Sequence, residues 1–251
     1  MKISVEDIRN MKGKTMIVVL TCYDYSFAKA IDGKVDIILV GDSLGNVILG
    51  YDKTKHVTME DMIRHLSAVR RGAPNTFIVC DLPYGSYDNQ KDAVINGRKL
   101  IKAGADAVKP EGNPKIVKAL VVNGIEVMGH IGHLPQSATK AKVHREWNRL
   151  LDDAKALEEA GAFAVVLEMV QTDIAKKITG VLCIPTIGIG ASKKCDGQVL
   201  VLYDLLGLYP DFSPKFVRKY LMLKEDVKQA VKLFSDDVKK GNFPSEKESF
   251  S

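Results

Sequence analysis

The chain has 251 residues, of which 46% are hydrophobic and 27% are charged, and it carries a formal net charge of +5. These values are ordinary for a globular protein, and the cationic residues form no basic stripe, so nucleic acid is not an expected partner. No segment approaches the 18 consecutive apolar residues that span a membrane, and the first residues lack the apolar run of a signal peptide.

The cysteines indicate a reducing compartment. They are Cys22, Cys80, Cys183 and Cys195, and no two have the Cys-x-x-Cys spacing of a zinc site or a redox pair. Cys22, Cys80 and Cys183 lie in or beside apolar runs, which predicts buried, reduced thiols. We therefore expect a cytoplasmic protein.

Short apolar runs recur along the chain and predict strands. In chain order they cover residues 16–22, 35–40, 77–80, 107–108, 125–128, 162–167 and 184–189, with a weaker eighth run at 198–202. Several runs are almost entirely apolar rather than alternating. Strands of a parallel sheet that is covered on both faces have this pattern.

Amphipathic segments between these runs predict helices at 58–71, 89–103, 114–122, 150–160 and 172–178. Thr58 is a candidate N-cap, with acidic residues in the turn that follows it. Gly104, Gly124 and Gly161 stand where three of these helices should end, because glycine readily adopts the left-handed conformation that stops a helix. After Pro214 the pattern predicts helix through Lys240, and residues 241–251 are expected to be disordered.

Eight strand–helix units predict an α/β protein, either a closed (β/α)₈ barrel, the TIM barrel, or an open doubly wound sheet. No Gly-x-Gly-x-x-Gly sequence follows the first strand, which weakens the open nucleotide-binding sheet. The chain length is typical of one barrel. We therefore predict a single-domain TIM barrel over residues 1–251, with extra helices at its C-terminal end.

Acidic, basic or imidazole side chains stand at the C-terminal ends of five successive predicted strands. They are Asp42, Asp81, Lys109 with Glu111 close behind it, His130 and Glu168. In a barrel these ends open on one face, which carries the active site. An Asp after a strand is more often a turn former or helix cap, but Lys and His do not cap helix N-termini.

The mixture of charges predicts a metal site. Several carboxylates close together repel one another unless a cation lies between them, and Mg²⁺ prefers one or two carboxylates and keeps open positions. Asp42 and Asp81 are the best ligand candidates. Lys109 would then be a fixed positive charge for an anionic substrate, and Glu168 is left as a candidate base.

Two further segments are open to either a functional or a structural role. The glycine-rich stretch Gly188 to Ala191 follows a strand, and it either lets backbone approach a ligand or packs tightly at the barrel mouth. Tyr23 and Asp24 end the first strand and could face the cavity.

Seven motifs in this order resemble the ketopantoate hydroxymethyltransferase family, over about residues 3 to 240. They are TCYDYSFAKA, VGDSLG, DLPYGSY, AVKPEG, MGHIGHLPQS, VLEMV and IPTIGIGA with CDGQVLV. The family belongs to the phosphoenolpyruvate/pyruvate barrel superfamily. The resemblance implies transfer of a hydroxymethyl group from 5,10-methylenetetrahydrofolate to 3-methyl-2-oxobutanoate in pantothenate synthesis, with Mg²⁺ and a homo-oligomer, commonly a decamer.

The resemblance also implies roles for individual residues. The metal ligands are Asp42, Asp81 and Glu111; the substrate-binding residues are Asp42, Ser43, Asp81, Lys109 and His130; and the proton acceptor is Glu168. Ser43 and Lys109 match groups that hold the substrate carboxylate, and His130 matches a histidine near the substrate oxygen.

The sequence departs from the family pattern in three places. Residues 138–149 form a shorter stretch than usual without the typical Gly-Gly-Tyr loop, GIGAS replaces GIGAG, and His133 replaces an apolar residue. These departures bear on two implications of the resemblance, lid closure and the contacts with folate. Two alternatives remain: another Mg²⁺-dependent lyase or mutase acting on 2-oxo acids, for which the catalytic-cysteine loop is lacking, and a non-catalytic barrel, which would be expected to lose a charged strand end.

Overall fold

The computed structural model describes residues 2–209 and 214–250, and the chain divides into two compact units, Met1–Val201 and Leu202–Ser251. The first unit contains all eight strands. They are β1 (Ile17–Thr21), β2 (Ile37–Val40), β3 (Phe77–Asp81), β4 (Ala107–Lys109), β5 (Met128–Gly132), β6 (Ala164–Glu168), β7 (Thr186–Ile189) and β8 (Gly197–Leu200).

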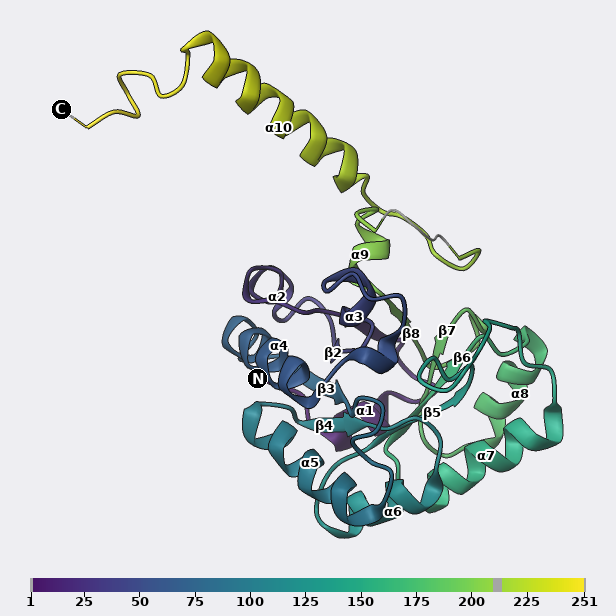
Figure 1. Ribbon diagram of the computed structural model, residues 1–251. Helices are drawn as coiled ribbons and strands as arrows, with labels where there is room; N and C mark the ends of the chain where they lie inside the picture. Colours follow the sequence, from purple (N-terminus) through teal and green to yellow (C-terminus); the bar gives the residue numbers. More distant parts are fainter. Residues whose placement is uncertain (1, 210–213, 251) are drawn as a thin grey trace. The chain divides into compact units, whose positions relative to one another are not determined.

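The strands form one parallel sheet in the order β4-β3-β2-β1-β8-β7-β6-β5. The two end strands meet through a parallel bridge between Val108 and Val127, with the Val108 N–H donating to the Glu126 carbonyl at 2.9 Å. The sheet therefore closes into a barrel, which confirms the predicted (β/α)₈ architecture (Figure 1).

Helices surround the strands. In the first unit they are α1 (Val5–Met11), α2 (Tyr25–Ile31), α3 (Leu44–Val47), the 3₁₀ helix η1 (Thr54–His56), α4 (Met59–Gly72), α5 (Gln90–Ala103), α6 (Pro114–Val122), α7 (Trp147–Glu159) and α8 (Thr172–Val181). Thr58 caps α4 as predicted, in a reciprocal capping box with Asp61. Gly104 and Gly161 follow α5 and α7 at φ +119° and +100°, so they end these helices as expected.

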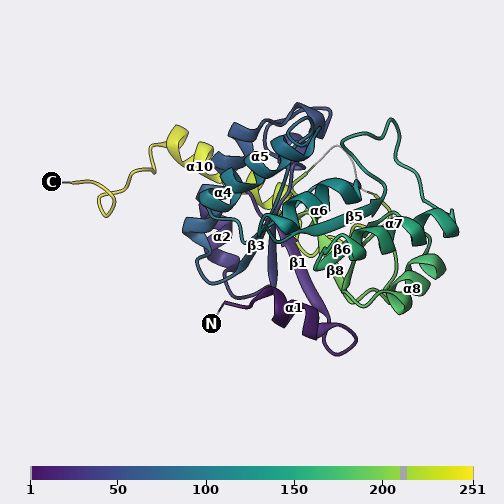
Figure 2. The same cartoon turned by 90° about the horizontal axis from the view of Figure 1, so that it is seen from below.

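The core fills the barrel with alternate side chains of the strands. Buried members include Val19, Leu39, Val79 and Val166, and Ile8 of α1 joins them. In the view from below, α1 lies beside β1 (Figure 2). Burying these apolar side chains contributes roughly 1.5–3 kcal/mol each before conformational entropy is subtracted.

Two sequence predictions about elements of the first unit are wrong. The strand expected at 125–128 lies three to four residues later, as β5. Its ladder with β6 begins where Met128 pairs with Ala164 and continues to the pair of Gly132 and Glu168. Two glycines in that segment lower its strand propensity, so the sequence alone does not indicate a strand there. Cys183 is exposed rather than buried, because β7 begins only at Thr186.

The second unit contains α9 (Leu202–Leu205) and α10 (Leu223–Lys240). The helix predicted after Pro214 begins only at Leu223; the residues of 214–222 that are described lie in turns and irregular chain. None of the α10 residues is buried. No helix in the described ranges is long and apolar enough to cross a bilayer.

Candidate active site

The barrel brings the predicted charged residues to one end. Asp81, Lys109 and Glu168 are the last residues of β3, β4 and β6, and Asp42 stands two residues beyond β2. Because all the strands are parallel, these residues share the C-terminal rim. Asp42, Asp81, Lys109, Glu111 and His130 are each at most 8% exposed.

A buried ion pair links the ends of β3 and β4. Lys109 Nζ lies 2.9 Å from Asp81 Oδ1, and both side chains are almost fully buried. The other oxygen, Asp81 Oδ2, accepts the backbone N–H of Asp42 at 3.1 Å. Asp81 therefore joins the rims of β2, β3 and β4.

His130 lies inside β5 rather than after it, and its ring has three charged neighbours, of which Glu111 is the most distant, with its Oε1 3.9 Å from Nδ1. Nε2 is 3.2 Å from Glu168 Oε2, and Nδ1 is 3.5 Å from Lys109 Nζ. An ammonium can only donate, so Nδ1 accepts, and Nε2, on the side of Glu168, carries the ring proton. Burial, with Lys109 next in effect, lowers the pKa of His130, which favours the neutral ring over the imidazolium.

Ser43 is held by Tyr23. The Tyr23 hydroxyl and Ser43 Oγ lie 2.8 Å apart, and Tyr23 is fully buried. Asp24, by contrast, has a structural role. Its side chain caps α2 by accepting the Phe27 N–H at 3.0 Å.

Close packing fixes the backbone around Glu168. Gly132 has φ +93°, and a Cβ there would lie 2.2 Å from the Glu168 carbonyl oxygen, so no other residue fits. Met169, directly after Glu168, has a left-handed φ of 49°. A non-glycine residue in this conformation carries a small strain cost, of the kind that concentrates at functional sites.

The sequence did not single out Gln136 and Tyr87. Gln136 is 6% exposed and donates from Nε2 to Asp42 Oδ2 at 2.8 Å, while its backbone N–H donates to Glu111 Oε2 at 3.2 Å. Tyr87 contacts both Gln136 and Glu111. Both lie within quoted motifs but are uncharged and away from strand ends, so a search for charged strand ends misses them.

The electrostatics of the rim are dominated by its carboxylates. Burial, followed by the charge of Asp81, raises the pKa of Asp42 to about 7. Burial likewise raises the pKa of Glu111 to about 9, against the opposing effect of Lys109. Burial alone would lower the pKa of Lys109, but the negative charges of Asp81 and the other carboxylates outweigh burial and raise that pKa.

This donor set fits a divalent cation. One lysine faces four carboxyl groups, those of Asp42, Asp81, Glu111 and Glu168, so their negative charges are not balanced when all are ionised. Carboxylate oxygens are hard ligands, which Mg²⁺ prefers. Within the described residues, no three His, Cys, Asp or Glu side chains already converge as a metal site. Asp42, Asp81 and Glu111 are the residues that would hold the ion.

Among the lesser sequence candidates, the glycine-rich stretch after β7 has a packing role at its first glycine. A Cβ at Gly188 would lie 3.1 Å from Cys195 Sγ and 3.2 Å from the Gln198 amide. His144, in the shortened 138–149 stretch, forms a bridge with Val170, and its ring lies 6.4 Å from that of His133. The shortened stretch is thereby attached to the chain just after Glu168.

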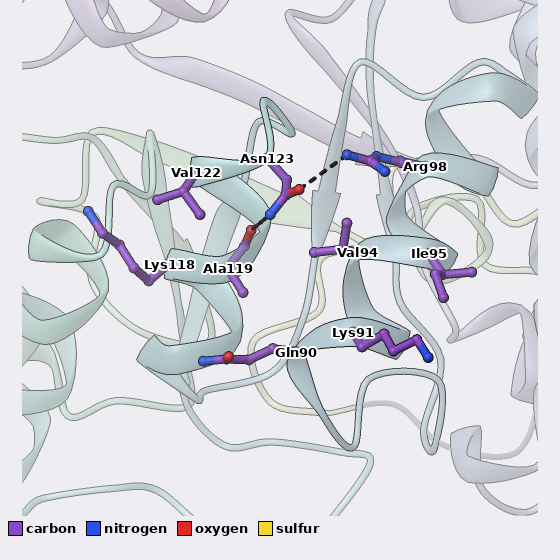
Figure 3. Close-up of a pocket in the computed structure, with 9 residues that line it drawn as sticks. All are labelled: Gln90, Lys91, Val94, Ile95, Arg98, Lys118, Ala119, Val122 and Asn123. Atoms are coloured by element: carbon purple, nitrogen blue, oxygen red, sulfur yellow. Dashed lines mark hydrogen bonds between the residues drawn. The ribbon is translucent and has the colours of Figure 1, made fainter.

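Two pockets lie near the helices. One of about 220 Å³ lies at the rim, between the start of α6, the end of β5 and α7, and Arg149 and Asp153 line it. The other, about 560 Å³, is a groove between α5 and α6 (Figure 3), lined by Lys91, Arg98 and Lys118 around apolar side chains such as Val94. None of the charged strand-end residues lines this groove.

The sequence model of the family described as ketopantoate hydroxymethyltransferase matches residues 2–246. The chain belongs to this family. A 3-methyl-2-oxobutanoate hydroxymethyltransferase from Thermotoga maritima is 51% identical over 260 residues, which cover 99% of this chain and 96% of that protein. One from Ignicoccus hospitalis is 48% identical over 258 residues, covering 98% of each.

Among solved structures, phosphonopyruvate hydrolase aligns with a TM-score of 0.68 at 13% identity, covering 99% of this chain and 93% of that one. At this identity the likeness concerns the fold alone. The sequence resemblance to the ketopantoate hydroxymethyltransferase family is thus confirmed by the family model and by full-length relatives.

Proposed function

We propose that the chain catalyses the reaction of 3-methyl-2-oxobutanoate, 5,10-methylenetetrahydrofolate and water to 2-dehydropantoate (ketopantoate) and tetrahydrofolate. The C3–H bond of the oxo acid breaks and a new C3–CH₂ bond forms to the one-carbon unit. Water supplies the hydroxyl oxygen, and the proton balance is completed on tetrahydrofolate. Family membership and the names of the full-length relatives support this activity.

The observation that carries the proposal is the placement of Glu168 opposite a buried cationic and carboxylate cluster. Glu168 Oε2 lies 3.2 Å from His130 Nε2, and His130 Nδ1 lies 3.5 Å from the Lys109 ammonium. A base and an anion-binding cation at one rim suit proton abstraction next to an oxo acid.

Asp42, Asp81 and Glu111 would hold Mg²⁺, which, when bound, withdraws charge from the keto group and makes the C3 proton more acidic. Lys109 and Ser43 bind the substrate carboxylate, with Tyr23 fixing the Ser43 hydroxyl at 2.8 Å. Their role is to orient the oxo acid so that C3 faces Glu168.

Glu168 accepts the C3 proton on its carboxylate. His130, as the neutral tautomer, places its Nε2–H side 3.2 Å from Glu168 Oε2 and so orients the carboxylate before substrate arrives. The burial of His130 and Lys109 excludes water from the base of the site, which strengthens each electrostatic contact.

The test is product formation with each component omitted in turn. We expect ketopantoate only when the 2-oxo acid, methylenetetrahydrofolate and Mg²⁺ are all present, and loss of activity with EDTA. Turnover of a 2-oxo acid or phosphonate without folate would favour the lyase or mutase alternative instead. Failure to exchange the C3 proton in NMR would favour a non-catalytic barrel.

We further propose that the chain acts in the cytoplasm as a homo-oligomer, a decamer by family resemblance. The second unit supports assembly, because α10 exposes Val227, Val231, Phe234 and Val238 at 45–60% along one helical face. Such a continuous apolar face is typical of an interaction surface. Light scattering coupled to size exclusion would measure the subunit number.

A further inference from the structure

Gln136 uses its side-chain amide and its backbone N–H to hold residues of the rim. It lies in the loop after β5, and its Nε2 donates to Asp42 Oδ2 at 2.8 Å and to the Leu82 carbonyl at 2.9 Å. Its backbone N–H donates to the Glu111 carboxylate, at 3.2 Å from Oε2 and 3.4 Å from Oε1. One neutral residue thus donates to two of the three carboxylates proposed as metal ligands.

Tyr87 completes this arrangement from the loop after β3. Its hydroxyl donates to Gln136 Oε1 and accepts the backbone N–H of Glu111 at 3.3 Å. Because the Gln136 amide meets two acceptors on one side and a donor on the other, its orientation is fixed by its partners. Rotation of the amide by half a turn would set oxygen against the Asp42 carboxylate.

The resulting network connects four successive loops of the barrel. Asp42 follows β2, Leu82 and Tyr87 follow β3, Glu111 follows β4, and Gln136 follows β5. At Asp42, Gln136 occupies Oδ2, and the described part of the chain places no hydrogen bond on Oδ1. The network therefore orients this carboxylate while one oxygen remains available for a ligand.

We propose that Gln136 is a positioning residue that, supported by Tyr87, sets the Asp42 and Glu111 carboxylates for a divalent cation. It also ties the loop after β5 to that site. This inference rests on the proposed function, since it takes those carboxylates as cation ligands.

Its physical basis is the cost of arranging like charges. Two buried carboxylates without fixed donors turn apart or take up protons, and the cation must then reorganise them as it binds. Donors already placed at 2.8 and 3.2 Å remove part of that cost. Loss of such outer partners commonly weakens metal affinity by about 10- to 100-fold.

The experiment compares four full-length proteins: wild type, Gln136→Met, Tyr87→Phe and, as a matched control, Gln90→Met. Methionine keeps the length of glutamine and removes its amide. Gln90 is an exposed residue at the start of α5, and its amide only reaches the Lys115 carbonyl at 3.5 Å. Mn²⁺ binding is followed by electron paramagnetic resonance of the free ion, and Mg²⁺ activation and thermal unfolding in EDTA are measured alongside.

We expect Gln136→Met to weaken Mn²⁺ binding by about 10- to 100-fold. Tyr87→Phe should weaken it by a smaller factor, and Gln90→Met should not change it. We also expect excess Mg²⁺ to restore most of the turnover of Gln136→Met, raising the activation constant more than it lowers kcat. A merely structural role would lower the unfolding temperature and leave the Mn²⁺ affinity of the folded protein unchanged.

A folded Gln136→Met with wild-type Mn²⁺ affinity overturns the inference. If that variant does not fold, wild-type affinity in Tyr87→Phe overturns it. A wild-type protein that binds no Mn²⁺ or Mg²⁺ refutes the proposed metal site itself, so the two failures are distinguishable.

Discussion

His130 Nε2 lies 3.2 Å from Glu168 Oε2, across the neighbouring strands β5 and β6. The contact joins the most deeply buried imidazole of the rim to the proposed proton acceptor. Since the Lys109 ammonium approaches the opposite ring nitrogen at 3.5 Å and can only donate, Nε2 is the nitrogen that carries the ring proton, on the side of Glu168.

Glu168→Gln should abolish most proton exchange at C3 while substrate and Mg²⁺ still bind. The amide keeps the shape and the contact with His130 but cannot accept a proton, so we expect about a 10²- to 10⁴-fold loss in exchange rate. Deuterium exchange followed by NMR measures this, with exposed Glu159→Gln on α7 as control. Exchange at the wild-type rate in Glu168→Gln would remove Glu168 from the role.

Much of the barrel could be predicted from the sequence, because apolar strands alternate with helices that begin and end at clear signals such as Thr58 and Gly104. β5 could not be predicted accurately, since Gly129 and Gly132 have low strand propensity and only pairing with β6 makes them a strand. The start of α10 could not be predicted either, because the apolar residues before Leu223, such as Phe216 and Tyr220, have the four-residue spacing of a helix.

The charged members of the site could be predicted because they stand at strand ends, where the barrel topology alone brings them together. Gln136 could not, since its role depends on which loops it reaches in space. Asp24 was ambiguous for the opposite reason: a carboxylate after a strand either caps a helix or faces the site, and only the hydrogen bond to the Phe27 N–H decides.

Asp81→Ala should lose metal-dependent substrate binding. The change removes a proposed ligand, leaves Lys109 without its 2.9 Å partner, and frees the Asp42 N–H. We expect at least a tenfold weaker binding of the oxo acid with Mg²⁺, close to the binding in EDTA, measured by calorimetry. The exposed Asp88→Ala serves as control; equal Mg²⁺ dependence in Asp81→Ala and wild type would refute the ligand assignment.

Lys109→Met should destabilise the metal-free protein strongly. Both partners of the Lys109–Asp81 pair are almost fully buried, so its removal leaves an uncompensated carboxylate. The expected loss is about 3–5 kcal/mol in the free energy of unfolding, measured with denaturant in EDTA. Lys91→Met on the exposed surface of α5 should change it by less than about 0.5 kcal/mol. If Lys109→Met lost as little free energy of unfolding as Lys91→Met, the Lys109–Asp81 pair would contribute little to stability.

Phe234→Asp should reduce the mass of the assembly. Phe234 is 56% exposed on the apolar face of α10, and a carboxylate there would be buried at an interface. Light scattering would then report smaller species, while Gln229→Asp, on the opposite face of the same helix, should leave the mass unchanged. Identical masses for both variants and wild type would show that this face is not an interface.

Stabilisation by Mg²⁺ should grow with pH. Burial raises the pKa of Asp42 to about 7 and that of Glu111 to about 9, so the folded metal-free protein keeps protons that the unfolded chain releases near its ordinary carboxyl values. Between those ordinary values and about pH 9 the folded state therefore binds more protons, and its free energy of unfolding falls as pH rises.

A cation binds the deprotonated carboxylates, so it competes with protons at low pH and offsets their repulsion at high pH. At a Mg²⁺ concentration about 100-fold above its dissociation constant the gain is about 2.7 kcal/mol. For a chain of this size that raises Tm by roughly 5–10 °C at pH 9, and by clearly less at pH 6. Thermal unfolding with Mg²⁺ and with EDTA at both values measures the difference, and Asp42→Asn should reduce its pH dependence. A Mg²⁺ shift that is equal at pH 6 and pH 9 would mean that Asp42 and Glu111 are not the groups that the ion meets.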